Sequence, residues 1–279
     1  MQNTSDLYRQ ILAADNHWYE TKCKINNVDY GESSLFSVST QSSMFSGNPE
    51  VGGAISAEID VSLLAPSVDI PVMAKVEPFV RIHGKIRTSS GATITDGIVD
   101  FGQGVSLSSN IATLSDQYFL ENDIVYGEVE YTDVVSEWLP QGIFYIDTRE
   151  TSNNGSGLRI LKIHGYDAIL FAEQYFPDTD EELPTLDTDV VDAIAEAMGV
   201  EVDARTYTLM TNGYTIPSVV GYTMRDTLGY IAAMYVGSFI MTEEGKLRLV
   251  SILELPEETN YLIDNAGDAI TFGGDRILV

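Results

Sequence analysis

Three histidines and one cysteine are the side chains best suited to nucleophilic or metal chemistry: His17, His83, His164 and Cys23. None of them lies near another at the spacing of a zinc-binding motif, so the sequence predicts no metal site of this kind. His164 stands at the predicted end of a strand, where a hydrogen-bonded structural histidine is a better expectation than a general base. Cys23 alternates with lysines that could lower its thiol pKa, but its strand pattern favours a small core residue.

Two loops contain residues typical of ligand sites without completing a motif. Gly102 and Gly104 begin a dinucleotide-binding pattern, but the third glycine and the following helix are missing. Residues 178–182 carry four carboxylates, which calcium prefers, yet the glycine that an EF-hand needs at its sixth position is absent. We therefore expect a solvated acidic loop there in preference to a calcium site.

No residue pattern predicts catalysis. With 42 Asp and Glu in 279 residues, carboxylate pairs occur by chance, so a glycosidase has no specific support. Trp18, Trp138 and many of the 15 tyrosines could form stacking platforms for sugars, although strand aromatics more often lie in a core. The prediction is no enzyme, with no catalytic, cofactor-binding or metal residues and no cofactor; saccharide binding remains the alternative.

The elements that would position these residues are mostly strands. Thr21, Cys23 and Ile25 alternate with Lys22 and Lys24, which is the pattern of a strand with one buried face. Further strands are predicted at 54–61 and at 76–82, where Pro78 favours a sheet edge. Hairpins are predicted at 93–100 around Asp96-Gly97, at 143–164 and at 238–252. Strands joined by hairpins give antiparallel sheets, typical of barrels or sandwiches.

Helical spacing of apolar residues predicts three helices, at 5–16, at 189–198 and from 224 onward. The predicted caps are Ser5 for the first, Asp187 or Thr188 for the second, and a Thr223–Asp226 capping box for the third. Gly199 and Gly237 are the predicted ends of the second and third helices.

Charge excludes some classes of protein. Fifteen Lys and Arg against 42 Asp and Glu give a formal net charge of −27, and no Lys or Arg occurs at 88–148 or 163–204. Nucleic-acid binding needs cations facing phosphates, so it is not expected. The acids form either a solvated face that keeps the protein soluble or a surface that stays close to DNA without binding it. A single cysteine excludes a disulfide scaffold, and neither a membrane span nor a secretion signal is expected.

Four segments, at 52–59, 136–146, 163–170 and 222–232, together resemble the tail hub proteins of phages and prophages. The resemblance rests on Ser-x-Trp-hydrophobic-x-x-Gly-x-Phe, on a strand leading into Tyr-Asp-Ala, and on a helix opening with Thr-x-Arg-Asp. Here these patterns fall on Ser136, Trp138, Gly142 and Phe144; on Tyr166, Asp167 and Ala168; and on Thr223, Arg225 and Asp226. They occur in the family's order along the chain.

The resemblance implies a mainly β (α+β) fold, with antiparallel tail-tube-like β-barrel domains joined by a small helix-containing domain. Residues 1–170 would form the first barrel, with an insertion at about 88–132. Residues 171–237 would form the small α/β connecting domain. Residues 238–279 would form a β-hairpin and the start of a second, short or incomplete β domain.

The resemblance also implies a structural virion protein of a phage or phage-derived tail, assembled in the cytoplasm of the bacterial host. Its copies would form a hub ring, expected to be a trimer, at the distal end of the tail tube. Partners would be the tube or distal tail protein, the tape-measure protein, and baseplate, tip or fibre proteins. DNA would pass through an acidic lumen without specific binding, and the chain would not insert in a membrane. The alternative is a saccharide-binding module at the tail tip.

Overall fold

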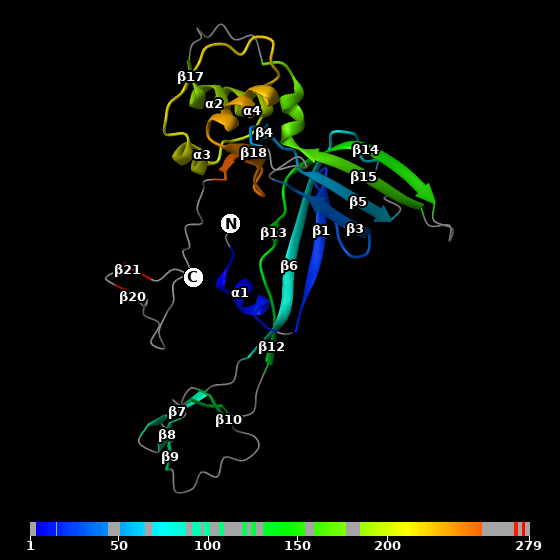
Figure 1. Cartoon of the computed structure of the whole chain (residues 1–279). Helices are drawn as coiled ribbons and strands as arrows, with labels where there is room; N and C mark the ends of the chain where they lie inside the picture. Colours follow the sequence, from blue (N-terminus) through cyan, green and yellow to red (C-terminus); the bar gives the residue numbers. More distant parts are fainter. Residues whose placement is uncertain are drawn as a thin grey trace. The chain divides into compact units, whose positions relative to one another are not determined.

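The computed structural model shows a mostly β chain with antiparallel sheets and a few helices, which is the α+β class expected from the sequence (Figure 1). It describes residues 4–14, 16–43, 51–64, 69–87, 91–95, 98–100, 106–108, 119–121, 124–126, 131–153, 159–176, 185–252, 271–272 and 275–276. The chain forms two compact units: residues 1–39 with 60–164, and residues 40–59 with 165–279. The predicted division into three domains stays a prediction.

The largest sheet has nine strands, and its order is β2-β1-β6-β14-β15-β5-β3, with β12 and β13 also paired to β6. Its strands are β1 (His17–Ile25), β2 (Val28–Tyr30), β3 (Leu35–Gln41), β5 (Glu58–Leu64), β6 (Lys75–Arg87), β12 (Tyr131–Val135), β13 (Leu139–Pro140), β14 (Phe144–Asn153) and β15 (Arg159–Asp167). The two ends of this path, β2 and β3, are not paired with each other in the described part of the chain. Among the described residues the sheet does not close on itself, and the predicted barrel stays a prediction.

Strand β6 lies in the interior of the sheet, so the expected edge position of Pro78 is wrong. On one side β6 pairs with β1 without interruption, from Val76 opposite Ile25 to Gly84 opposite His17. On the other side its partner changes from β13 to β14, and the register shifts by one residue between these partners. Pro78 lies at this shift, where its carbonyl accepts the Gln141 N–H at 2.9 Å. A proline, which has no N–H, is tolerated at such an interruption of the ladder.

Strands β6 and β12 are joined through a separate small sheet. Arg87 at the end of β6 is opposite Tyr131 at the start of β12, so the chain leaves and returns at neighbouring positions. Between them, a sheet of order β10-β11-β7-β8-β9 contains β7 (Gly91–Thr95), β8 (Ile98–Asp100), β9 (Ser106–Ser108), β10 (Phe119–Glu121) and β11 (Ile124–Tyr126). Thr95 is opposite Ile98, as a two-residue turn requires, while Asp96 and Gly97 themselves lie outside the described residues.

The buried face of β1 and β6 follows the predicted alternation. Cys23 and Ile25 of β1, and Val76 and Ile82 of β6, are almost inaccessible to solvent. Helix α1 (Asp6–Leu12) packs against β6, and Ser5 caps it by accepting the Tyr8 N–H at 3.0 Å. Ile11 approaches Gly84 so closely that a Cβ there would lie 2.5 Å from the Ile11 side chain. Glycine at position 84 is therefore a packing requirement.

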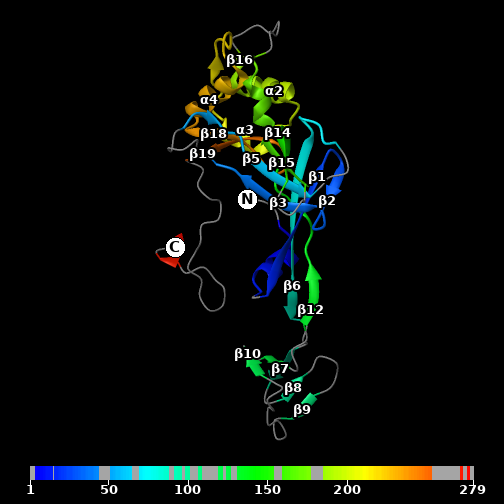
Figure 2. The same cartoon turned by 90° about the vertical axis from the view of Figure 1, so that its right-hand side faces the viewer.

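The second unit contains most of the helices (Figure 2). Its elements are β4 (Gly53–Ala54), the 3-10 helix η1 (Ala168–Glu173), β16 (Thr185–Leu186), α2 (Asp187–Met198), α3 (Ala204–Leu209), β17 (Thr215–Ile216), α4 (Met224–Met234), β18 (Gly237–Met241), β19 (Leu247–Ser251), β20 (Thr271–Phe272) and β21 (Asp275–Arg276). β18 and β19 form the expected antiparallel hairpin, whereas β18 and β4 pair in parallel. α4 packs against β4, β18 and η1.

Three predicted helix boundaries differ from the structure. The first helix, predicted over 5–16, ends at Leu12. α2 begins at Asp187 after Leu186, with no side-chain cap, because Asp187 is buried and binds a tyrosine instead. α4 ends at Met234, and the left-handed conformation after it falls on Val236 (φ 52°), not on Gly237. Gly237 begins β18, where the Val250 carbonyl leaves no room for a Cβ. The Thr223–Asp226 capping box and the left-handed Gly199 (φ 72°) are confirmed.

Candidate functional site

One face of the β1–β6 pair gathers cations that are scarce elsewhere in the chain. In a strand, alternate residues share a face, and residues directly opposite each other on paired strands lie on the same side. The face opposite the core thus holds five Lys and Arg against two Glu, with three aromatic rings. We call this set the cationic face: Lys22, Lys24, Lys75, Arg81 and Lys85; Glu20 and Glu77; Trp18, Phe79 and His83.

Glu20 lies at the centre of the cationic face. One of its oxygens, Oε2, accepts hydrogen bonds from Arg81 Nε at 2.7 Å and Nη2 at 2.6 Å, and lies 2.6 Å from His83 Nε2. Burial alone would raise the pKa of Glu20, but the bonds from His83 and Arg81 hold that pKa below its ordinary value. The carboxylate is therefore a fixed anion, unsuited to taking up protons near neutral pH. Sequence reasoning missed this cluster, although Glu20 and Arg81 lie opposite each other across the pair.

Aromatic rings flank this cluster. Trp18 stacks on His83 with ring centroids 3.9 Å apart and remains 53% exposed. Arg81 and Lys22 lie over the Trp138 ring, 4.3 and 4.8 Å from its centroid. Such cation–π contacts stabilise half-buried tryptophans. The ring of Trp138, which belongs to the motif that resembles the tail hub family, thus contacts cations of the protein itself.

The cysteine and the two other histidines of this unit lie in surroundings that fit a structural role. Burial, together with the charge of Glu77, raises the pKa of the Cys23 thiol to about 12, so its neighbouring lysines do not activate it. His164 Nδ1 lies 2.9 Å from Asp60 Oδ1, as expected of a hydrogen-bonded histidine. His17 Nδ1 lies 2.8 Å from the Ala14 carbonyl oxygen.

In the second unit, Asp167 of the Tyr-Asp-Ala pattern connects two segments. Its carboxylate accepts the Ser56 hydroxyl at 2.7 Å, the Ala57 N–H at 2.7 Å and the Ile169 N–H at 3.0 Å. The last bond caps η1. Burial raises the pKa of Asp167, and the three donors oppose that shift. The hydrogen bonds of Asp167 therefore indicate a structural role, in which it connects the 52–59 segment to η1.

Arg225 and Gly229 connect α4 to the same segment. Arg225 Nε donates to the Ala54 carbonyl at 2.9 Å, while its Nη1 pairs with Glu173. A Cβ on Gly229 would lie 2.7 Å from the Gly52 carbonyl oxygen, so only glycine allows this approach. Three of the four segments that resemble the tail hub family therefore meet at one junction, formed by 52–59, 163–170 and 222–232.

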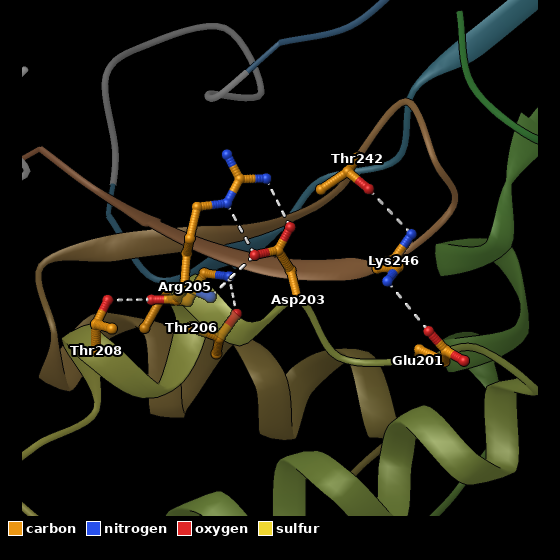
Figure 3. A network of polar contacts seen from close by, with 8 residues as sticks. Glu201, Asp203, Arg205, Thr206, Thr208, Thr242 and Lys246 are labelled. Carbon is orange, nitrogen blue, oxygen red and sulfur yellow. Dashed lines mark hydrogen bonds and ion pairs between the residues drawn. The ribbon is translucent and has the colours of Figure 1, made fainter. Parts of the chain in front are cut away.

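Two acid networks stabilise the rest of this unit. Asp187 accepts the Tyr235 hydroxyl in the core and the Thr188 N–H at 2.9 Å. Asp203 caps α3 and binds Arg205 Nε at 2.8 Å and Nη2 at 2.6 Å (Figure 3). Hydrogen bonding from Arg205 lowers the pKa of Asp203 to about 2.

The second unit also exposes tyrosines. Tyr222 and Tyr230 contact edge to face with centroids 5.3 Å apart, and Tyr230 is 61% exposed. Tyr175 pairs through its backbone with Thr223 and is 72% exposed. These rings are more exposed than the half-buried Trp138.

Within the described ranges, no three His, Cys, Asp or Glu are grouped as a metal site would require. The acidic loop 178–182 and the Gly102–Gly104 pattern lie outside those ranges. No described helix combines the length and apolar character that crossing a membrane demands.

Comparison with solved structures finds phage tail proteins. One is the 43 kDa tail protein of prophage MuSo2 from Shewanella oneidensis, with 13% identity and a TM-score of 0.49, covering 92% of this chain and 62% of that protein. Another is the tail protein from Neisseria meningitidis MC58, with 10% identity and a TM-score of 0.42, covering 90% of this chain and 53% of that protein. The chain thus spans less than two thirds of either. No family model and no curated protein matches the chain.

Proposed function

We propose that this protein is a non-enzymatic structural component of a phage or phage-derived tail. Its copies form a hub ring, a trimer in the simplest arrangement, at the distal end of the tail tube. The ring connects the tube, tape-measure, baseplate and tip proteins, and its chains contain tail-tube-like barrels. The protein is assembled in the host cytoplasm and resides in the virion.

The observation that supports this proposal is the junction at 52–59, 163–170 and 222–232. Segments that resemble the tail hub family are distant in sequence, yet Asp167 and Arg225 of the shared patterns both bond to the 52–59 segment, and Gly229 lies against it. The shared pattern therefore has a structural meaning, because each residue holds the fold together. A set of chance matches would not be expected to converge in this way.

The charge of the chain supports a role beside DNA. A net charge of −27 disfavours contact with phosphates, so carboxylates that line a ring would let DNA slide past without holding it. This part of the proposal requires a lumen lined by acids.

Negative-stain imaging and light scattering of the purified chain test the ring. The expected result is a closed ring with a hole wide enough for duplex DNA, and cryo-electron microscopy should then place carboxylates in the lumen. A ring whose lumen is neutral or basic would contradict the DNA-passage role. Particles without a hole, combined with no incorporation into tails, would contradict the hub role.

The exposed tyrosines favour one second candidate, saccharide binding at the tail tip. Tyr175, Tyr222 and Tyr230 offer ring faces on which sugars stack. Titration with soluble cell-wall oligosaccharides would test it: binding that Tyr222→Ala and Tyr230→Ala abolish would support this function, and no binding by the wild type would remove it.

A further inference from the structure

The cationic face contains positive charges without acidic partners. Lys24 forms no ion pair with any described residue, and the Lys22 ammonium contacts only the Phe79 and Trp138 rings, at 5.2 and 4.8 Å from their centroids. Both side chains are half-buried, where charges are screened less by salt than on an open surface. An anionic partner at this face would therefore gain more than it would at a fully solvated lysine.

The chain itself offers a matching surface on α2. Asp189, Asp192 and Glu196 follow one another at spacings of three and four, so they share the exposed face of the helix. None of the three forms an ion pair in the described part of the chain; Asp189 and Asp192 accept only the hydroxyls of Thr185 and Tyr207. The whole stretch 163–204 lacks Lys and Arg, so a cation that binds this face must come from another part of the chain or from another molecule.

We infer that the cationic face of one copy binds the acidic face of α2 on a second copy. The inference rests on the proposed ring, and it names the surfaces that would form it. The partner is a second copy because every copy presents both charges, and because neither the lysines at 22 and 24 nor the three acids of α2 form an ion pair with a described residue. Such a contact joins two different surfaces, so it repeats from copy to copy and closes a ring when the rotation permits.

Charged contacts of this type depend strongly on ionic strength. The contact itself should weaken by about tenfold or more between about 20 mM and about 0.5 M salt. Salt also relieves the repulsion between two chains of net charge −27, so the contact is read from the difference in association between the wild type and Lys22→Glu/Lys24→Glu at each salt concentration. A contact formed mainly by apolar burial would not weaken with salt.

Charge reversal provides the decisive experiment on the full-length chain. Lys22→Glu/Lys24→Glu and, separately, Asp192→Lys/Glu196→Lys should each weaken self-association by about tenfold or more in sedimentation velocity. Mixing the two variants should restore association, because the reversed faces complement each other. Circular dichroism checks folding, and Lys22→Gln/Lys24→Gln provides a milder version if the Glu variant unfolds.

Matched controls carry the same change of net charge elsewhere. Arg159→Glu/Lys162→Glu alters exposed cations of β15, and Glu243→Lys/Glu244→Lys alters the exposed turn between β18 and β19. Both should leave association close to wild type.

The outcomes separate this inference from the proposed function. Rings that survive both reversals would keep the hub proposal and overturn this contact. A wild-type chain that stays monomeric at low salt and high concentration would also overturn the contact, whereas its incorporation into tails by partner proteins would still support the hub role. Restoration of association in the mixed variants would support the contact.

Discussion

At the scale of residues, buried acids hold the second unit together. Asp187 is fully buried, and Tyr235 is 8% exposed, so their hydrogen bond is shielded from water. Burial raises the pKa of Tyr235, and the bond to the Asp187 carboxylate adds to this shift, which keeps the hydroxyl a donor. Removal of the Tyr235 hydroxyl oxygen should therefore destabilise the folded protein.

Tyr235→Phe should lower the free energy of unfolding by about 1–3 kcal/mol, because the Asp187 carboxylate would remain buried without this donor. Urea denaturation measures the change. Tyr214→Phe is the control, since its exposed side chain accepts a hydrogen bond from the exposed Asn212 amide, and it should change stability by less than about 0.5 kcal/mol. Equal effects of the two variants would contradict the role given to Asp187.

Asp203 predicts a pH dependence. Its folded pKa of about 2 lies below the ordinary 3.8, so its contribution to stability is present above pH 3.8 and is lost as pH falls toward 2. Asp203→Asn should remove that contribution, on the order of 1 kcal/mol, because Arg205 is half exposed and water weakens the pair. The difference in urea midpoint between wild type and variant should shrink between about pH 4 and pH 2. A constant difference over this range would show that Asp203 acts without its charge.

At the scale of elements, α4 depends on close contact and on its first turn. Gly229 faces the Gly52 carbonyl, and Thr223 with Asp226 forms the capping box. These features fix where the helix lies against β4 and where it begins.

Gly229→Ala should destabilise the protein by about 1–3 kcal/mol, although alanine normally favours a helix interior over glycine. The physical reason is the clash of the new Cβ with the Gly52 backbone. Gly31→Ala is the matched control, because nothing lies within 4 Å of a Cβ there. Thermal unfolding of both variants measures the contrast, and a stabilised Gly229→Ala would disprove the close approach.

Thr223→Ala should cost about 1 kcal/mol by leaving the Asp226 N–H without its cap. Thr208→Ala removes an exposed hydroxyl that only bonds the Arg205 carbonyl, and it should stay within about 0.5 kcal/mol of wild type. Urea midpoints of the two variants provide the comparison, and an unchanged midpoint for Thr223→Ala would show that the cap does not stabilise α4.

At the scale of the whole molecule, the net charge of −27 opposes the folded state through self-repulsion. The melting temperature should therefore rise when salt increases from about 10 mM to about 0.15 M, which shortens the Debye length from roughly 30 to 8 Å. Calorimetry at low protein concentration separates this effect from association. A melting temperature that falls with salt would indicate that favourable ion pairs dominate.

The sequence by itself determined the local features of this protein. The alternation around Cys23, the Ser5 cap, the Thr223–Asp226 box, Gly199 and the β18–β19 hairpin all depend on residues a few positions apart, and short-range sterics and hydrogen bonding specify them. The acidic character of the chain follows from its composition alone.

Only the tertiary structure decided which distant residues meet. Pro78 is tolerated inside the sheet because the partner strands shift register there. Asp187 does not cap α2, because its carboxylate binds a tyrosine 48 residues away. The cationic face required the pairing of β1 with β6, and the junction required Asp167 and Arg225 to reach the segment around Ala54. Register and packing set these contacts, and the pattern of a single strand or helix leaves its partner and its register undetermined.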